Sequence, residues 1–207
     1  MNALKTVRWR TAAVTVSLTL LPAMASAQST FSLSGEVTSQ ASITSDYRFR
    51  GVSQTFGDPA FQAGTELLLP SQFYLGTWAS TIDKQVLVGS RGIEWDVFGG
   101  YRWELANGLK FDIGLIQYVY LGESSLNTLE AYASANFEFV TLTYSNALSN
   151  KFFGVSNARG SAYYDLTVNY PVGPSLVAFA HYGIQQVSKN EGDYSDYSNG
   201  LEKEWKG

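Results

Sequence analysis

The 207-residue sequence contains no cysteine and only one histidine. Disulfide bonds, which often stabilise small exported domains, are therefore excluded. The sequence shows no Cys/His cluster with the spacing of a metal site, and no EF-hand loop, P-loop or dinucleotide-binding fingerprint. We therefore expect no cofactor and no metal.

Lysine and arginine are the scarcer charged residues, with 14 of them against 18 aspartates and glutamates. Three of the basic residues lie within the first ten positions, and no acidic residue lies within the first 27. The rest of the chain is therefore clearly acidic, which argues against nucleic acid as a partner.

Beyond the N-terminus, the sequence has no apolar run of the length that a membrane helix needs. At the N-terminus, basic residues precede a short apolar run over 11–21, and residues 25–27 (Ala-Ser-Ala) resemble a cleavage site. This pattern predicts a secretory signal peptide over residues 1–27, with a retained anchor as the alternative. Residues 28–207 would then form one exported domain.

The dominant pattern that is present is an alternation of apolar and polar residues, clearest between Ile93 and Tyr120. A period of two predicts strands with one apolar and one polar face. The mean hydropathy of −0.08 is close to neutral, as in membrane strands, whose apolar residues occupy alternate positions. The apolar face of the first strand in this stretch carries Ile93, Trp95, Val97, Tyr101, Trp103 and Leu105.

The turn within this stretch can be predicted in detail. A two-residue Asn-Gly loop would place Leu105 opposite Lys110 and mix the two faces. A three-residue loop over 106–108, with positive φ at Gly108, instead pairs Leu105 with Leu109. This register creates two pairs of opposite charge and one aromatic pair across the strands. The pairs are Glu104–Lys110, Arg102–Asp112 and Trp103–Phe111.

The same pattern predicts ten strands, most of them long enough to cross a membrane at a tilt, which takes about 9–11 residues. Short turns and longer polar loops alternate between them, which in outer-membrane barrels places the two kinds of connection at opposite ends. The predicted strands are Glu36–Phe49, Ala60–Leu69, Gln72–Ile82, Ile93–Leu105, Leu109–Tyr120, Asn127–Phe137, Val140–Ser149, Ser161–Val172, Ser175–Val187 and Tyr194–Trp205.

Two fold classes share this alternation. A soluble sandwich buries the apolar faces between two sheets, whereas a membrane barrel turns them toward lipid and its charges toward the lumen. The regular alternation of short turns with longer loops favours an all-β, antiparallel, up-and-down transmembrane β-barrel. Two places fit poorly. The parity slips after Leu115, which suggests a bulge or the emergence of the strand above the membrane, and the strand over Tyr194–Trp205 is charged and weakly apolar.

The segment Ser45–Thr55 (SDYRFRGVSQT) carries a resemblance to a known family. It resembles the signature of the TorF-like porins, a bacterial family of uncharacterised function. The likeness continues through residues 58–59, 62, 73–80, 94–96, 99–101, 112–114 and 163–165. The resemblance implies a bacterial outer-membrane barrel that acts as a porin. It also implies a further hairpin, so we expect a truncated chain and about twelve strands in the complete barrel. Ten is also an even number of strands, and closure with ten is the alternative.

By parity, most charged residues of the strands are expected to line the lumen, where an acidic excess would weakly favour cations. The alternative is that they pair with one another and fill the barrel, since barrels of ten to twelve strands lie between plugged and water-filled ones. The candidate lumen residues are Asp46, Arg48, Arg50, Glu66, Glu94, Asp96, Arg102, Glu104, Lys110, Asp112, Glu130, Asp165 and His181.

The expected function is passive diffusion of small hydrophilic solutes or ions, with outer-membrane lipid as the other partner. Arg48 and Arg50 could steer an anionic solute or form a structural ion-pair network. A non-conducting structural barrel and a soluble lipocalin-like binder are alternatives. An outer-membrane lipid hydrolase would need a serine beside His181; the sequence shows no such motif, and we expect no enzymatic activity.

Overall fold

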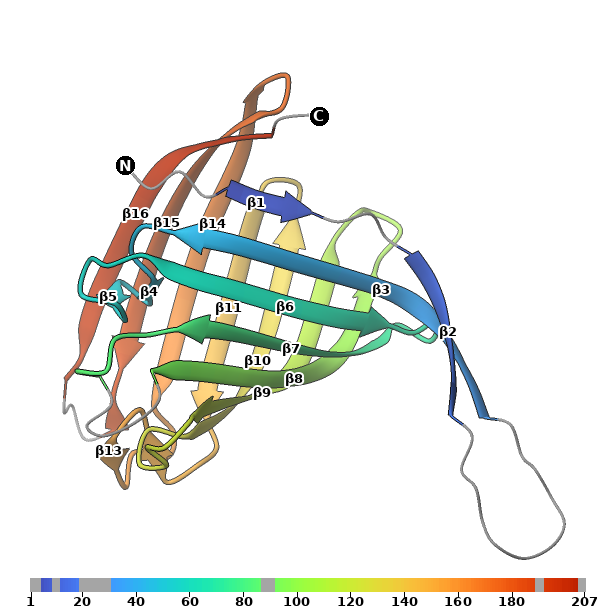
Figure 1. Cartoon of the computed structure of the whole chain (residues 1–207). Coiled ribbons are helices and arrows are strands. Elements are labelled where there is room, and N and C mark those ends of the chain that lie inside the picture. Colours follow the sequence, from blue (N-terminus) through green and yellow to red (C-terminus); the bar gives the residue numbers. More distant parts are fainter. Residues whose placement is uncertain (1–4, 9–11, 19–30, 87–91, 189–191, 205–207) are drawn as a thin grey trace, which may run out of the picture.

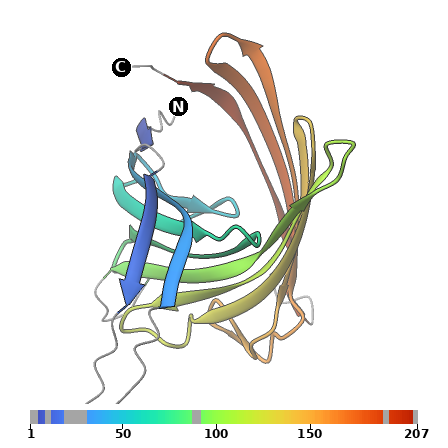
Figure 2. The same cartoon turned by 90° about the vertical axis from the view of Figure 1, so that its right-hand side faces the viewer.

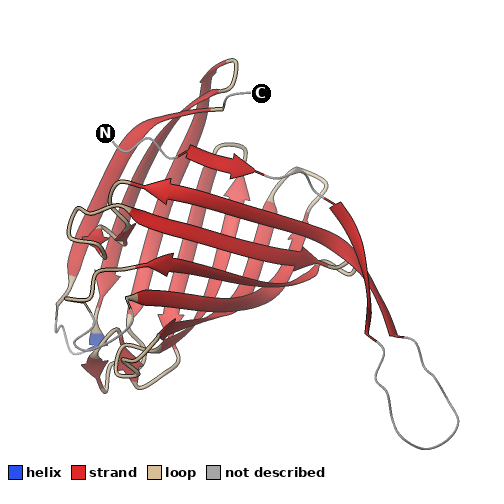
Figure 3. Cartoon of the chain, viewed as in Figure 1, coloured by secondary structure: helices blue, strands red, loops and turns tan. Residues whose placement is uncertain are grey.

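The computed structural model describes residues 5–8, 12–18, 31–86, 92–188 and 192–204. Its main elements are β-strands in antiparallel pairs (Figures 1 and 3). The ten long strands are β3 (Phe31–Thr44), β6 (Ala60–Leu68), β7 (Phe73–Thr81), β8 (Ile93–Glu104), β9 (Lys110–Tyr120), β10 (Thr128–Phe137), β11 (Val140–Ala147), β14 (Ala162–Gly173), β15 (Leu176–Gln186) and β16 (Tyr194–Lys203).

Each long strand pairs with the next along the chain, so the sheet is a simple meander from β3 to β16. The sheet curves strongly, and its two ends face each other across an open side (Figure 2). Within the described part of the chain, no pairing joins β16 to β3 or to the strands beside β3. The structure is therefore a curved open sheet with a concave and a convex face.

Two short strands, β1 (Lys5–Arg8) and β2 (Ala12–Leu18), pair with the free edge of β3. Both lie within the predicted signal peptide. The expected cleavage point after residue 27 is outside the described residues. Strand pairing does not test cleavage, so the signal peptide stays a prediction.

The predicted all-β antiparallel fold is confirmed, and each of the ten predicted strands corresponds to one of the ten long strands. The main difference concerns the strand predicted over Glu36–Phe49, which ends at Thr44. The chain then leaves the sheet and forms a separate hairpin from β4 (Arg48–Phe49) and β5 (Val52–Ser53). The weakly apolar tenth strand is present over Tyr194–Lys203.

The predicted register of the β8–β9 hairpin is confirmed. Glu104 lies opposite Lys110, Arg102 opposite Asp112 and Trp103 opposite Phe111. Leu105 N–H donates to the carbonyl of Leu109 at 2.9 Å, and Gly108 has φ of +84°. The rings of Trp103 and Phe111 stack with centroids 5.0 Å apart.

The bulge predicted after Leu115 is wrong. The β8–β9 register runs without interruption from Glu94–Tyr120 to Glu104–Lys110. Tyr118 and Tyr120 keep their parity and are buried on the concave side, 6% and 4% exposed. The apparent slip arose because this end of the concave face is aromatic where the rest of it is polar.

The two kinds of connection lie at opposite ends of the sheet (Figure 3). One end holds the short turns, such as those between β8 and β9 and between β10 and β11. The other end holds the loops that contain β4–β5 and a second small hairpin, β12 (Lys151–Phe152) with β13 (Val155–Ser156). This end is called the loop end below.

The two faces of the sheet differ sharply in character. Large apolar side chains on the convex face are exposed; Leu75 is 61% exposed and Leu142 is 56% exposed. Acidic side chains on the concave face are buried; Glu94 and Glu130 are both 0% exposed. No second sheet covers the apolar side chains within the described residues, as a sandwich would require. None of the described segments is a helix of the length and apolarity that would cross a membrane.

Candidate functional site

The inward hairpin, residues 47–55, is the central feature of the concave face. It contains most of the motif singled out from the sequence. Phe49 pairs with Val52, and the two residues between them, Arg50 and Gly51, have φ of +48° and +78°. Positive φ at both central residues is the pattern of a tight two-residue turn that suits the twist of a hairpin. The turn places Arg50 at the tip.

The carboxylate of Asp46 holds the base of the inward hairpin. It accepts hydrogen bonds from the hydroxyls of Ser53 at 2.5 Å and Thr55 at 3.1 Å, and Arg48 Nε lies 2.6 Å away. Burial acts to raise the pKa of Asp46, but the bonds from Ser53, Thr55 and Arg48 outweigh it and lower this pKa below its ordinary value. Ionised Asp46 therefore favours the hairpin.

At the tip, Arg50 crosses the concave space and binds strands on the far side. Its two terminal nitrogens donate to the Glu130 carboxylate on β10 at 2.9 and 2.7 Å, and one also donates to Gln185 on β15 at 3.2 Å. The side chains of Arg50 and Glu130 are 7% and 0% exposed. The guanidinium also lies 4.4 Å from the ring centroid of Tyr163. A buried bidentate pair of this kind fixes the hairpin in one position.

The tip also lies against β16. A Cβ atom on Gly51 would be only 2.4 Å from Cβ of Asp196, so only glycine fits there. Asp196 is bound in turn to His181, whose two ring nitrogens each lie 2.9 Å from a carboxylate oxygen, of Asp196 and of Asp165. Both nitrogens can donate only from a protonated imidazole.

Aromatic residues cap the loop end around the hairpin. Phe153, between β12 and β13, packs edge-on against Phe49 with centroids 5.3 Å apart and against Tyr118 at 5.1 Å. Tyr120 joins the same cluster. The inward hairpin is thus held by the ion pair at its tip and by apolar contacts on its side.

A second ion-pair cluster lies nearer the short turns. Arg102 binds both oxygens of Glu66, at 2.5 and 2.9 Å, and Asp112 at 3.0 Å. Its guanidinium lies 3.7 Å from the ring centroid of Tyr74. The Tyr74 hydroxyl donates to Asp112 at 2.5 Å and also contacts Tyr132. These residues tie together β6, β7, β8, β9 and β10 across the concave face.

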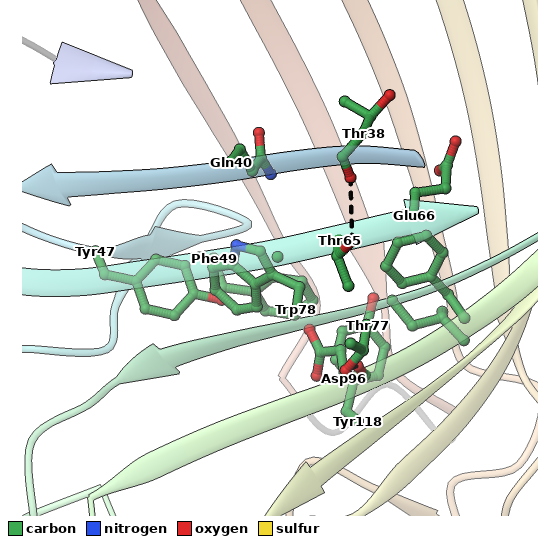
Figure 4. A pocket seen from close by; sticks show the side chains of 13 residues that line it. Thr38, Gln40, Tyr47, Phe49, Thr65, Glu66, Thr77, Trp78, Asp96 and Tyr118 are labelled. Carbon is green, nitrogen blue, oxygen red and sulfur yellow. Dashed lines mark hydrogen bonds between the residues drawn. The ribbon is translucent and has the colours of Figure 1, made fainter. Parts of the chain in front are cut away.

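Two cavities flank the inward hairpin, and Phe49 lines both of them. The first, called cavity A, has a volume of about 580 Å³ and lies against β3 and β6–β9; Figure 4 shows its lining. The second, cavity B, has about 650 Å³ and lies against β11 and β14–β16. Both fall in the size range of small-molecule sites.

The predicted lumen residues form five groups in the structure. Arg48, Arg50, Asp46 and Glu130 organise the hairpin, and Glu66, Arg102 and Asp112 form the second cluster. Glu94 and Asp96 are buried without a basic partner among the described residues, and Asp165 and His181 line cavity B. Glu104 and Lys110 form only an exposed pair at 3.9 Å beside a turn.

Sequence reasoning missed Gln185 and Asp196, which complete the contacts of the hairpin tip. Parity could have placed both on the concave face, since each pairs within the regular β15–β16 register. It could not have shown that a hairpin from the other end of the chain reaches them.

Comparison with known families identifies a matching family. The model of a family described as a bacterial protein of unknown function (Gcw_chp) matches residues 24–207. Searches of curated proteins and of solved structures found no match.

Proposed function

This chain belongs to Gcw_chp, a bacterial family of unknown function, and we propose that it acts as an outer-membrane β-barrel with a narrow passage for small hydrophilic solutes or ions. The observation that carries the proposal is the inverted burial of the sheet. Apolar side chains such as Leu75 and Leu142 face outward and are more than half exposed, whereas charged ones face inward. Large exposed apolar surfaces indicate contact with lipid or with another protein.

The arrangement of strands and loops supports the same proposal. Most of the ten strands have 9–12 residues, about the length of a tilted strand that crosses the bilayer. Sorting of long loops to one end and short turns to the other is typical of outer-membrane barrels. A barrel in lipid also requires that the free edges of the sheet be paired, because unpaired backbone groups are not tolerated there.

The inward hairpin defines what such a passage would be. It occupies the loop end and leaves cavities A and B on either side, with volumes of about 580 and 650 Å³. Solutes would pass beside a fixed hairpin rather than through an open pore. The passage would therefore be narrow and lined by charged and aromatic residues. Such a passage agrees with the porin activity that the resemblance to the TorF-like family implies.

The full-length chain, refolded in detergent and inserted in a planar lipid bilayer, tests this function. Folding is checked first by heat-shifted migration in a gel. We expect discrete conductance steps with a mild preference for cations. A folded and inserted protein without conductance steps would contradict the channel.

A non-conducting structural barrel is the second candidate, and the buried Arg50–Glu130 pair favours it, because a fixed hairpin obstructs the interior. A variant in which Arg50→Ala frees the tip separates the two. Conductance only in this variant would identify a closed barrel, whereas conductance in both proteins would support the channel. His181 gives no support to a hydrolase, since its bonded neighbours are Asp165, Asp196, Tyr163 and Thr167.

A further inference from the structure

We infer that cavity A binds an organic ammonium cation, with the carboxylate of Asp96 as its counter-charge and Trp78 and Tyr118 in its aromatic wall. This inference rests on the proposed function and deepens it, because it names the class of solute that would pause in the passage. Three features of the cavity carry it: an uncompensated carboxylate, an aromatic lining and a suitable size.

The carboxylate is the first feature. Asp96 projects from β8 into cavity A (Figure 4) and is only 5% exposed. Its Oδ1 atom has no hydrogen-bond partner among the described residues. A buried carboxylate without a partner is costly unless it is neutralised or paired with a cation.

No cation of the described protein supplies that charge. The lining of cavity A contains two carboxylates, Asp96 and Glu66, and no lysine, arginine or histidine among the described residues. Glu66 is already paired with Arg102 at 2.5 Å. Glu94, two residues before Asp96 and on the same face, is fully buried and has one oxygen, Oε2, without a hydrogen-bond partner in the described structure.

The aromatic wall is the second feature. Tyr47 and Trp78 meet edge to face with centroids 5.4 Å apart, and Phe49 and Tyr118 meet in the same way at 5.4 Å. All four line cavity A together with Phe98. Aromatic faces attract cations, and organic ammonium groups are commonly recognised by several such rings.

Size and donor number favour an organic cation over a metal ion. The cavity of about 580 Å³ is far larger than one ion, and the described residues include no group of three or more metal-ligating side chains. Calcium takes about 6–8 oxygen ligands, whereas an alkylammonium group needs one counter-charge and apolar contact.

The test is calorimetric titration of the full-length chain, refolded in detergent, with choline and with its uncharged isostere 3,3-dimethylbutan-1-ol. We expect choline to bind and the isostere to bind at least about tenfold more weakly, because the charge is what Asp96 and the rings recognise. Equal binding of the two compounds would overturn the inference, and so would the absence of heat with choline.

Two variants locate the site. Asp96→Asn keeps the shape of the side chain and should weaken choline binding at least about tenfold, and Trp78→Leu should weaken it through the lost ring. Glu104→Gln removes one negative charge at an exposed position outside the cavity and should leave binding unchanged. Choline binding that survives Asp96→Asn would contradict the site.

The choline titration tests the cation site and the conductance measurement tests the channel, so either result can be negative without the other. A channel that conducts but binds no choline removes the inference and leaves the proposed function. A barrel that binds choline through Asp96 but stays electrically silent removes the channel and leaves the cation site.

Discussion

The Arg50–Glu130 pair shows how one buried interaction fixes the position of a whole segment. The two residues are 80 positions apart in the sequence and form two parallel hydrogen bonds. Because both side chains are almost fully buried, water cannot replace either partner. Removing one partner should therefore cost far more than removing an exposed pair.

Glu130→Gln is the direct test of this pair. It leaves the Arg50 charge buried and uncompensated, and we expect it to lower the free energy of unfolding by about 3 kcal/mol. Denaturant unfolding of the refolded protein, followed by tryptophan fluorescence, measures this loss of stability. Glu104→Gln removes the exposed pair with Lys110 and should change stability by less than about 1 kcal/mol. Similar losses in both variants would show that the hairpin tip is not docked as described.

Asp46 should give the inward hairpin a dependence on acid. Its pKa is lowered in the folded protein, so its stabilisation is present above the ordinary carboxylate pKa. That stabilisation is lost as the pH falls through the lowered value. If the proposed channel forms, conductance fluctuations of the wild type should therefore grow on acidification below about pH 4, near the ordinary pKa of aspartate. The conductance of the Asp46→Asn variant should already fluctuate at neutral pH and should change less on acidification. If the wild type and the variant respond to acid in the same way, Asp46 is not the cause.

At the scale of elements, the β8–β9 hairpin depends on one backbone conformation. Gly108 has φ of +84°, which residues with a Cβ adopt at a cost. We expect Gly108→Val to lower the free energy of unfolding by about 1–2 kcal/mol, measured by the same denaturant titration. Gly173→Ala is the matched control, because its added Cβ meets only Leu176 at 3.9 Å and its φ is not in the positive range. A neutral Gly108→Val would mean that the turn has a different type.

The strands and the β8–β9 register could be predicted because each follows from a local rule. Alternation determines which residues share a face. The requirement that Leu105 and Leu109 lie on the same apolar face then selects a three-residue turn. The same rule puts charged residues such as Glu94 and Glu130 on one face of the sheet, which is the concave face in the structure. These rules operate between neighbours in sequence or across one turn.

The inward hairpin could not be predicted, because its contacts join distant segments. The alternation of Glu36–Phe49 continues past Thr44 as if the strand did, and nothing local marks the point where the chain leaves the sheet. Tyr118 and Tyr120 looked misplaced for the same reason: their partner Phe153 lies in another loop. Sequence parity therefore described the sheet but not what fills its concave side.

The exposed apolar side chains of the convex face would be costly to replace with charged ones only if that face contacts lipid. Leu115, at the middle of β9, is 50% exposed on the convex side. In lipid, Leu115→Lys should lower the free energy of unfolding by about 2–4 kcal/mol. On a water-facing surface the same substitution should change this free energy by less than about 0.5 kcal/mol.

Unfolding of the refolded protein from lipid vesicles measures this difference. Leu115→Ala serves as the control for lost side-chain contacts and should lower the free energy of unfolding less than Leu115→Lys. If lysine and alanine have the same small effect, the convex face does not contact lipid.

The charge balance of the inward hairpin has an electrical consequence. Together with Asp46 at its base, the inward hairpin carries two arginines and one aspartate, and Arg48 and Asp46 neutralise each other. Arg50 is neutralised from outside, by Glu130 on β10. If the hairpin detaches from β10, Glu130 remains on the strand, and the detached segment then carries one net positive charge. One elementary charge that crosses the full potential is worth about 2.3 kcal/mol per 100 mV. In the proposed channel, release of the hairpin would therefore move a single charge, and we expect it to depend only weakly on voltage.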